Sequence, residues 1–425
     1  MAKDVPADPM CDPANPREVP FSEIACASYV ISGSVVKTPC LRSANLSEMT
    51  GCDLYIKREY MQTTGSFKER GARYALSKLS KEAKVSGVIC ASAGNHALGM
   101  SFHGRLLGIP VTVVMPKNAP LVKVNNCRVH KAKTILSGDN LQQSKDYALT
   151  LSKEKGMCYI NGYDHPDVIA GQGTIGLEIV EQVPDVDVVI VQVGGAGLLA
   201  GISLAVKTLR PQATVIAVEP ERCRSFSHSM NAGAPVEVSL KPTLADGLAV
   251  SMVGYNAFKI ASKCVDKIVC VSETVIATAI LKLVEVEKVV VEGAGAAGFA
   301  ALLTKTVPEL QGKKVVIVLS GGNIDTTVLC HTLRRGLALE GRLIRFTLIL
   351  DDRLGVNHLT QLLSKRNATI RDVHIEKVWT PTDVHCEQAR VVVETRDGDH
   401  ATEVEEALRA VYPDLSCDKL TKGEN

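Results

Sequence analysis

The sequence predicts an α/β protein that contains a mainly parallel sheet and, after it, a smaller ferredoxin-like domain. From about residue 85 to 330, runs of β-branched residues alternate with stretches of helix length, which is typical of βα units. The pattern changes near Arg334, and the last part of the chain reads as a βαββαβ order. A chain of 425 residues is long enough for two or three such domains.

Seven apolar runs are expected to form the strands of the parallel sheet. Each run is rich in Val and Ile, and each ends in small or turn-forming residues. The runs occupy residues 87–94, 110–116, 133–138, 186–195, 214–220, 267–273 and 313–322. Because ligands of parallel sheets gather at the carboxyl ends of the strands, we expect the polar and glycine-rich clusters that follow these runs to form the site.

The two ends of the chain differ from this central part. Residues 1–20 contain five prolines and no apolar core, so they are expected to be a disordered tail rather than a targeting signal. Near the other end, residues 343–352, 369–379 and 389–397 are expected strands, and residues 356–368 and 400–412 are expected helices. We therefore expect a separate domain over residues 342–421.

Composition excludes several classes of protein. The net charge is +2 and no long basic run occurs, so nothing indicates binding to nucleic acid or to a membrane surface. Residues 188–206 lack charge, but their β-branched start and glycine cluster favour a buried strand, a loop and a helix over a membrane span. The thirteen cysteines are scattered without a CxxC pair, which indicates reduced thiols in a cytoplasmic protein.

The segment "QTTGSFKERGARYAL", residues 62–76, places a lysine where a positive charge is unfavourable. Ser66 and Glu69 have the spacing of a capping box, so a helix is expected to begin there. Lys68 would then lie in the first turn, where the helix dipole disfavours an ammonium group. Either Lys68 is an ordinary solvated lysine, or it is a nucleophilic amine whose pKa is lowered.

The glycine-rich segment "VIVQVGGAGLLAG" allows two ligand interpretations. With Glu219 nineteen residues beyond Ala200, it has the spacing of a dinucleotide-binding fingerprint on Gly195, Gly197 and Ala200. Alternatively, the backbone amides of four successive residues surround one phosphate at a helix N-terminus; these are Gly194, Gly195, Ala196 and Gly197. A tight strand-to-helix junction without a ligand is the third possibility.

Other motifs separate these interpretations. A nicotinamide enzyme has no evident use for Lys68, for "SAGNH" at 92–96 or for "SGGN" at 320–323. A pyridoxal-phosphate enzyme needs a lysine for the aldehyde, a phosphate site, a polar partner for the pyridine nitrogen and a donor near the ring hydroxyl. The sequence offers all four.

Together the motifs "KREYMQTTGSFKERGA", "SAGNHALG", "AGQGTIGLEI", "VGGAGLLAG", "TLADGLAV" and "LSGGN" resemble the fold-type II pyridoxal-phosphate family, in its threonine dehydratase and serine racemase branch. The match runs over residues 21–335. It implies two doubly wound α/β lobes, the smaller over about residues 86–164 and inserted in the larger. The terminal part resembles an ACT regulatory domain, although Leu354 stands where that family usually has proline.

The resemblance implies a role for each motif residue. Lys68 holds the cofactor through its aldehyde and later takes the Cα proton, while Phe67 lies near the ring and Asn95 meets the ring hydroxyl. Ser320 meets the pyridine nitrogen. The loop that binds the substrate carboxylate comprises Ser92, Ala93, Gly94, Asn95 and His96. The phosphate site comprises Gly194, Gly195, Ala196, Gly197 and Leu198, with Ala196 where a glycine is usual; if that position needs a positive φ, the alanine costs about 1 kcal/mol.

The resemblance also implies an activity. Racemases of this branch have a second serine where this chain has Ala93, so dehydration of L-threonine, and of L-serine, is favoured over racemisation. The products are 2-oxobutanoate, or pyruvate, and ammonia. No metal is expected, because Glu219 matches one ligand position of the family but Ser225 replaces an aspartate. The ACT-like domain implies an amino-acid effector and a homo-oligomer, either a dimer or a tetramer.

Three alternatives stay open at the level of sequence. One is a serine racemase or serine dehydratase of the same family. The others belong to different classes, namely a nicotinamide dehydrogenase that uses the glycine-rich segment and a non-catalytic amino-acid sensor built on an inactive scaffold.

Overall fold

The computed structural model describes residues 5–304, 306–351, 355–379 and 385–420. The chain divides into two compact units. The first comprises residues Met1–Ala279 and Leu283–Ile324, and the second comprises Ile280–Lys282 and Asp325–Asn425. Helix α14 (Thr326–Leu339) groups with the second unit.

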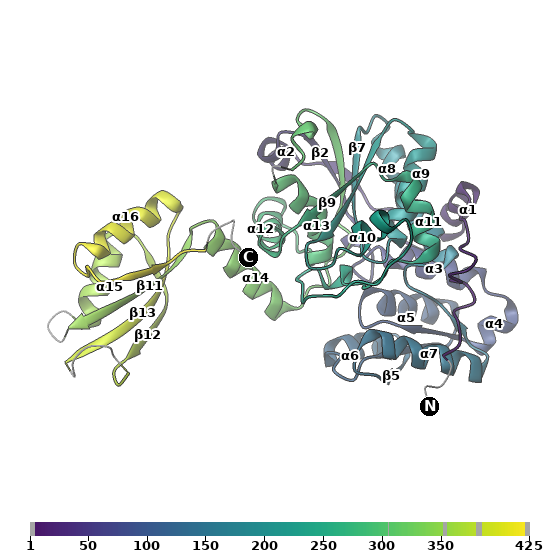
Figure 1. Ribbon diagram of the computed structural model, residues 1–425, viewed down its shortest axis with the longest axis horizontal. Coiled ribbons are helices and arrows are strands. Elements are labelled where there is room, and N and C mark those ends of the chain that lie inside the picture. Colours follow the sequence, from purple (N-terminus) through teal and green to yellow (C-terminus); the bar gives the residue numbers. More distant parts are fainter. Residues whose placement is uncertain (1–4, 305, 352–354, 380–384, 421–425) are drawn as a thin grey trace. The chain divides into compact units, whose positions relative to one another are not determined.

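A six-stranded sheet is the centre of the first unit, with the order β1-β2-β10-β7-β8-β9 (Figure 1). Only the edge pair β1 and β2 is antiparallel; the other neighbours are parallel. The strands are β1 (Cys40–Arg42), β2 (Asp53–Lys57), β7 (Val188–Gln192), β8 (Thr214–Pro220), β9 (Lys267–Val271) and β10 (Lys314–Val318).

Helices cover both faces of this sheet, as buried parallel strands require. In Figure 1, α1 (Phe21–Ile31), α8 (Pro166–Gln182), α9 (Gly197–Leu209) and α11 (Tyr255–Cys264) lie on one side, and α12 (Glu273–Lys282) and α13 (Gly293–Leu303) lie on the other. The shorter helices of this part are α2 (Ala44–Thr50) and α10 (Ser225–Ala232), with a 3-10 turn at Asp246–Leu248 and a π-helical turn at Leu283–Glu287.

A second, wholly parallel sheet has the order β5-β4-β3-β6. Side chains alternate between its faces, because successive residues of a strand point to opposite sides. Val113 packs in the core beside α5, whereas its neighbour Val114 packs with Ala148 of α7 on the other face. The elements are β3 (Val88–Ala91), β4 (Val111–Met115), β5 (Lys133–Leu136), β6 (Cys158–Tyr159), α3 (Lys68–Lys78), α4 (Lys81–Ser86), α5 (Asn95–Leu107), α6 (Leu121–Val129) and α7 (Leu141–Lys155).

The second unit has an antiparallel sheet with the order β12-β13-β11-β14. This is the ferredoxin-like strand order, so the predicted fold class is confirmed. Its core joins Phe346, Leu348, Leu359, Val391 and Val404. The elements are β11 (Leu343–Asp351), α15 (Gly355–Lys365), β12 (Thr369–Glu376), β13 (Cys386–Glu394), α16 (Gly398–Arg409) and β14 (Ser416–Asp418). Leu354 lies outside the described residues.

The seven expected strands belong to two sheets, since β3, β4 and β5 form the smaller sheet while β7, β8, β9 and β10 form the larger. This division confirms the two α/β lobes that the family resemblance implies, which the strand pattern alone did not distinguish from a single sheet. The expected disordered tail is wrong for residues 5–20, because Asp8, Cys11 and Val19 in this segment are at most 8% exposed. The composition of residues 5–20 does not reveal that this segment packs on the first unit, because backbone groups of Met10, Pro16 and Arg17 make several of its contacts.

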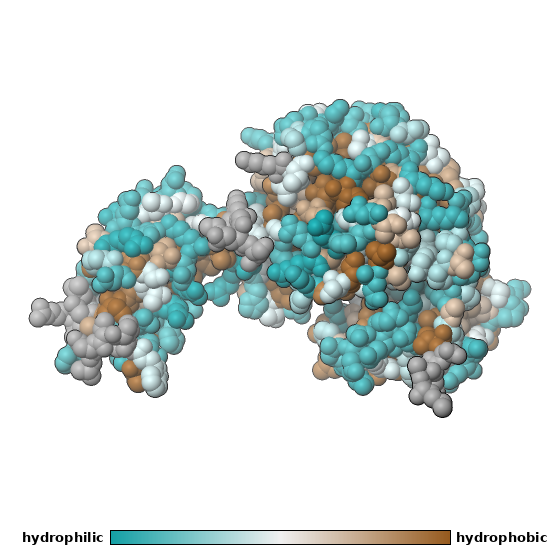
Figure 2. Space-filling model, viewed as in Figure 1, coloured by the Kyte–Doolittle hydropathy of each residue, from teal (hydrophilic) through white to brown (hydrophobic). Residues whose placement is uncertain are grey.

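The surface in Figure 2 is mostly hydrophilic, with smaller apolar areas between the polar ones. Residues 188–206 form β7, a glycine-rich turn and most of α9, as expected. In the described part of the chain, no helix is both long and apolar enough to cross a membrane.

Candidate active site

Lys68 is the first residue of α3, directly after Phe67. Burial lowers the pKa of Lys68 to about 8, although the negative charge of Glu292 opposes this shift. The direction of this shift agrees with the nucleophilic interpretation of Lys68, and its largest cause is burial. The Lys68 ammonium donates a hydrogen bond to the carbonyl of Gly162, and it lies 5.2 Å from the centre of the Phe67 ring.

The helix start beside Lys68 differs from the expected capping box. Phe67, not Ser66, is the N-cap residue, and no side chain caps the helix. The backbone of Ser66 instead forms a bridge with Gly321, and the Phe67 N–H donates to the carbonyl of Ser320 at 2.9 Å. Pairing with the end of β10 thus decides where α3 begins, and it leaves the buried Ser66 hydroxyl without a partner among the described residues.

Asn95 begins α5 and joins a chain of polar contacts near Lys68. Its Nδ2 donates to Oε1 of Glu292 at 2.7 Å, and its Oδ1 accepts from Nδ2 of Asn323 at 2.8 Å. Asn323 also donates to the carbonyl of Thr64 at 2.7 Å. The side chain of Asn95 is therefore oriented from both sides.

Glu292 is a site residue that the sequence analysis did not single out. It is 6% exposed, and burial, with a contribution from Asp246, raises its pKa to about 7. A carboxyl group that is partly protonated near neutral pH beside a lysine is typical of functional sites. Its only signal in the sequence is one acidic residue between an apolar run and a run of small residues, a pattern too common to stand out.

The loop at residues 92–96 connects β3 to α5. The Ser92 hydroxyl accepts a hydrogen bond from the Gly94 N–H at 3.2 Å, which closes a short turn around Ala93. His96 is 4% exposed, and its Nε2 lies 3.1 Å from the carbonyl of Ile160. Burial and the charge of Lys68 lower the pKa of His96 to about 3, so the ring is neutral.

The glycine turn, residues 194–198, connects β7 to α9. Among the described residues, no hydrogen bond uses the N–H groups of Gly194, Gly195, Ala196, Gly197 or Leu198. Buried N–H groups without partners are costly, and at a helix N-terminus they are suited to a phosphate. Ala196 has a φ of +72°, so the strain anticipated at this position is present.

Close packing explains two glycines of this turn. A Cβ on Gly195 would lie 2.2 Å from Cγ of Tyr163, and a Cβ on Gly197 would lie 2.1 Å from the Tyr163 carbonyl oxygen. Tyr163 follows Gly162, the acceptor of the Lys68 hydrogen bond. The segment 162–163 therefore lies against both Lys68 and the glycine turn.

The structure brings the predicted residues to one region. Phe67, the residue before Lys68, donates its N–H to the carbonyl of Ser320 just after β10, and Ser320 is 2% exposed. Asn95 reaches the same region through Glu292, whose N–H donates to the carbonyl of Gly321 at 3.0 Å. These segments follow β3, β7 and β10, as ligand sites of parallel sheets do.

Glu219 lies outside this group of residues. Its carboxylate accepts hydrogen bonds from the N–H groups of Phe226 and Ser227, at 3.1 and 3.2 Å, at the start of α10, whose first residue is Ser225. Burial raises the pKa of Glu219. Because its oxygens are engaged by α10, Glu219 is poorly placed to bind a ribose hydroxyl, which weakens the dinucleotide interpretation.

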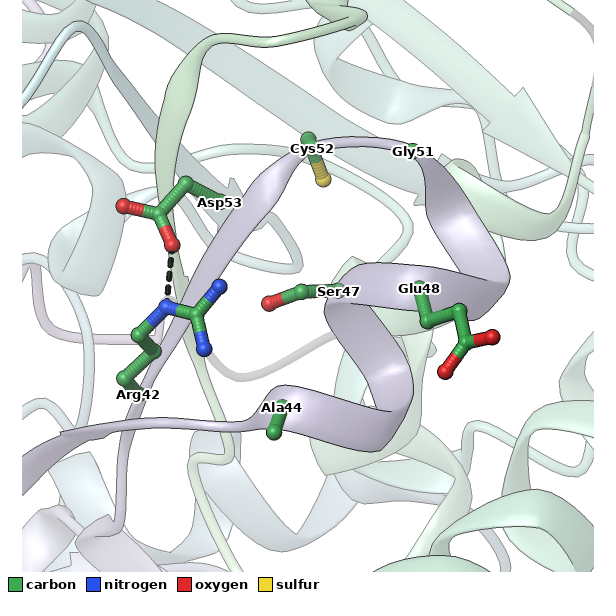
Figure 3. A pocket seen from close by; sticks show the side chains of 7 residues that line it. All are labelled: Arg42, Ala44, Ser47, Glu48, Gly51, Cys52 and Asp53. Atoms are coloured by element: carbon green, nitrogen blue, oxygen red, sulfur yellow. Dashed lines mark hydrogen bonds and ion pairs between the residues drawn. The ribbon is translucent and has the colours of Figure 1, made fainter.

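The first unit has two surface hollows. One, of about 470 Å³, borders the site at Thr64, Gly65 and Asn323. The other, of about 580 Å³, lies beside β1 and β2 and contains the ion pair between Arg42 and Asp53 (Figure 3). None of the seven residues labelled in Figure 3 belongs to the predicted site. The hollow at Thr64, Gly65 and Asn323 is therefore the better entrance to the site.

Comparison with known proteins agrees with this geometry. Residues 31–321 match the model of a family described as pyridoxal-phosphate dependent enzyme. Over 393 residues, the chain is 40% identical to an L-threonine ammonia-lyase of Thermotoga maritima, which covers 92% of this chain and 98% of that protein.

Solved structures show the same likeness. The processed form of threonine deaminase isoform 2 from Solanum lycopersicum has a TM-score of 0.71 and 32% identity, over 78% of this chain and 99% of that one. Maize serine racemase has a TM-score of 0.71 and 32% identity, over 76% and 98%. The chain therefore belongs to the family of pyridoxal-phosphate dependent enzymes.

Proposed function

We propose that this protein is an L-threonine ammonia-lyase that eliminates water from L-threonine, and also from L-serine. The observation that carries the proposal is the pairing of Lys68, whose pKa is about 8, with the glycine turn of unpaired N–H groups. The overall reaction balances, since L-threonine becomes 2-oxobutanoate and ammonia, with the water that is lost regained on hydrolysis. The relative from Thermotoga maritima, named L-threonine ammonia-lyase, supports this assignment.

The cofactor is pyridoxal phosphate, and the residues present fit it. The free N–H groups of residues 194–198 are suited to its phosphate, and the amine of Lys68 is suited to its aldehyde. Phe67 and Asn95 are proposed to contact its ring and ring hydroxyl, and Ser320 its pyridine nitrogen. When bound, pyridoxal phosphate supplies an electron-withdrawing ring that makes the Cα proton of an amino acid acidic.

Lys68 is the proposed base for that proton. A lysine with a pKa near 8 is partly neutral at physiological pH, whereas an ordinary lysine is almost wholly charged. The N–H groups and side chains of the 92–96 loop are proposed to hold the substrate carboxylate. His96 is neutral, so it adds no positive charge to that loop.

Ser320 and Ala93 bear on which reaction follows proton removal. A serine hydroxyl does not stabilise a protonated pyridine as a carboxylate does, so prompt loss of the β-hydroxyl is favoured over a long-lived carbanion. Ala93 has no proton to deliver to the opposite face of Cα, which argues against racemisation. The likeness to maize serine racemase keeps that reaction as the second candidate.

The Thermotoga relative aligns over 92% of the chain and so extends into the second unit, for which we propose a regulatory role through a bound amino acid. We also propose a homo-oligomer. All thirteen cysteines are free thiols, which supports a cytoplasmic location.

The test measures ammonia release from L-threonine, L-serine and D-serine with added pyridoxal phosphate, together with conversion of L-serine to D-serine. We expect release from the two L-amino acids and none in Lys68→Ala. Lys78→Ala, in the last turn of the same helix, is the control and should keep its activity. Absence of ammonia from both L-amino acids would refute the proposal, and rapid racemisation would favour the second candidate.

A further inference from the structure

The N-terminal segment, residues 8–17, is built into the first unit. Asp8 is 7% exposed and Cys11 is 8% exposed. The segment turns back on itself, because the Cys11 N–H donates to the carbonyl of Asp8 at 3.1 Å. The Lys259 ammonium of α11 also donates to the carbonyl of Pro16 at 2.9 Å. These contacts give the segment a defined place against α11.

Asn256, the second residue of α11, is the main link between this segment and the rest of the unit. Its side chain is 0% exposed. Nδ2 donates to the carbonyl of Met10 and to the carbonyl of Asp164, both at 2.8 Å. Oδ1 accepts from the N–H of Arg17 at 2.6 Å. One buried amide thus connects two points of the N-terminal segment with Asp164.

Asp164 and α11 in turn hold the glycine turn. The carboxylate of Asp164 accepts from the N–H groups of Tyr255, at 3.1 Å, and Ala257, at 2.9 Å, at the start of α11. Gly254, the residue directly before α11, donates its N–H to the carbonyl of Gly195 at 3.1 Å. On the other side, the Tyr163 ring lies so close to Gly195 that a Cβ there would overlap it.

We propose that Asn256 is a positioning residue through which the N-terminal segment holds the glycine turn in the geometry that binds the cofactor phosphate. Convergent N–H groups bind an anion well only when their directions are fixed, so a small displacement of Gly195 weakens several hydrogen bonds together. The inference rests on the cofactor site proposed above, and it assigns a role to residues 8–17 that the catalytic scheme does not use.

Two variants test this role in the full-length chain. Asn256→Ala removes all three hydrogen bonds of the side chain. Arg17→Pro removes the N–H that donates to Asn256, since proline has no amide hydrogen, together with the Arg17 side chain. Arg17→Ala keeps that N–H and is the matched control, because it removes the same side chain, with its charge and its exposed hydrogen bond to the Pro9 carbonyl.

The readout is the dissociation constant of the apoenzyme for pyridoxal phosphate and, separately, for pyridoxal, which has the aldehyde but no phosphate. We expect about tenfold weaker binding of pyridoxal phosphate in Asn256→Ala and Arg17→Pro, a tenfold change being about 1.4 kcal/mol. Pyridoxal should bind both variants as it binds the original protein, and Arg17→Ala should behave like the original protein with both compounds.

Three results would overturn the inference. Equal binding of pyridoxal phosphate in all variants shows that the segment does not act on the turn. Equal weakening for pyridoxal and pyridoxal phosphate shows a general disturbance of the fold, and so does weakening in Arg17→Ala. If Asn256→Ala does not fold, Arg17→Pro decides alone. Failure of the original protein to bind either compound would instead contradict the proposed function.

Discussion

A buried ion network beside Lys68 leads to a prediction about stability. Arg70 of α3 is 0% exposed and donates to both carboxylate oxygens of Glu59, at 2.7 and 2.8 Å. It also donates to both oxygens of Glu178, at 2.6 and 2.9 Å. Lys57 donates to Glu178 as well, at 2.5 Å, so that two cations balance two anions away from water.

Replacing Arg70 by methionine leaves an unbranched apolar side chain, although a shorter one, and removes every one of these donors. Glu59, itself 0% exposed, then loses its main partner. Removing one member of a buried ion pair typically costs about 3–5 kcal/mol, because the remaining charge is uncompensated. We expect the free energy of unfolding of Arg70→Met to fall by about that amount.

The dependence on pH has a defined sign. Burial would raise the pKa of Glu59, but the Arg70 guanidinium outweighs it and lowers the pKa below its ordinary value. In the original protein this carboxylate therefore stabilises the fold above the pKa of the unfolded state, and the contribution is lost as the pH falls. In Arg70→Met the buried carboxylate prefers to be protonated, so the deficit should shrink toward acid pH.

Urea unfolding followed by circular dichroism measures the effect. Arg73→Met is the matched control, since Arg73 lies in the same helix, is half-buried and has no ion pair among the described residues. It should cost less than about 1 kcal/mol. Adding Glu59→Gln to Arg70→Met removes the uncompensated charge and should recover part of the loss. Equal losses in Arg70→Met and Arg73→Met, or no recovery in the double variant, would refute the reasoning.

Three further predictions concern the cofactor site. Because the pKa of Lys68 is about 8, the rate at which the apoenzyme captures pyridoxal phosphate should rise with pH up to about 8 and then level off. Stopped-flow absorbance measures this rate, and a rate that still rises near pH 10 would contradict the prediction. Gly195→Ala should weaken pyridoxal phosphate binding by more than about tenfold, because its Cβ would overlap Tyr163, whereas Gly298→Ala, which meets only atoms at 3.8 Å or more, should not. Ala196→Gly should raise the free energy of unfolding by about 1 kcal/mol, since it relieves the positive φ; a loss of stability would show that the buried methyl group matters more.

Much of the fold followed from local pattern. The strand and helix order of both units was predictable, because strands buried on two faces are apolar along their length and helices of this size separate them. The division of the strands into two sheets was not derivable from periodicity alone, since the residues of a buried parallel strand do not indicate which strands it pairs with. The edge strand β1 and its neighbour β2 were not among the expected strands, because they are only three and five residues long.

The site was predictable to the extent that its chemistry lies in contiguous motifs. The segments around Lys68, Asn95, Ser320 and the glycine turn are such motifs, and the fold brings them to one region. The capping box at Ser66 failed because a distant partner, Gly321, holds the serine backbone and so moves the helix start. The capping-box pattern describes the preference of a short segment by itself, and pairing with a distant segment can override that preference.

Residue type and spacing along the chain are enough to predict the class of fold, the family resemblance and the set of reactive groups. The lowered pKa of Lys68, the presence of Glu292 beside it, and the docking of residues 8–17 on Asn256 become visible only in the folded chain. Each of these depends on burial and on contacts between segments far apart in sequence. Burial determines the free-energy cost of charging a side chain, and a side chain is buried only once the chain has folded.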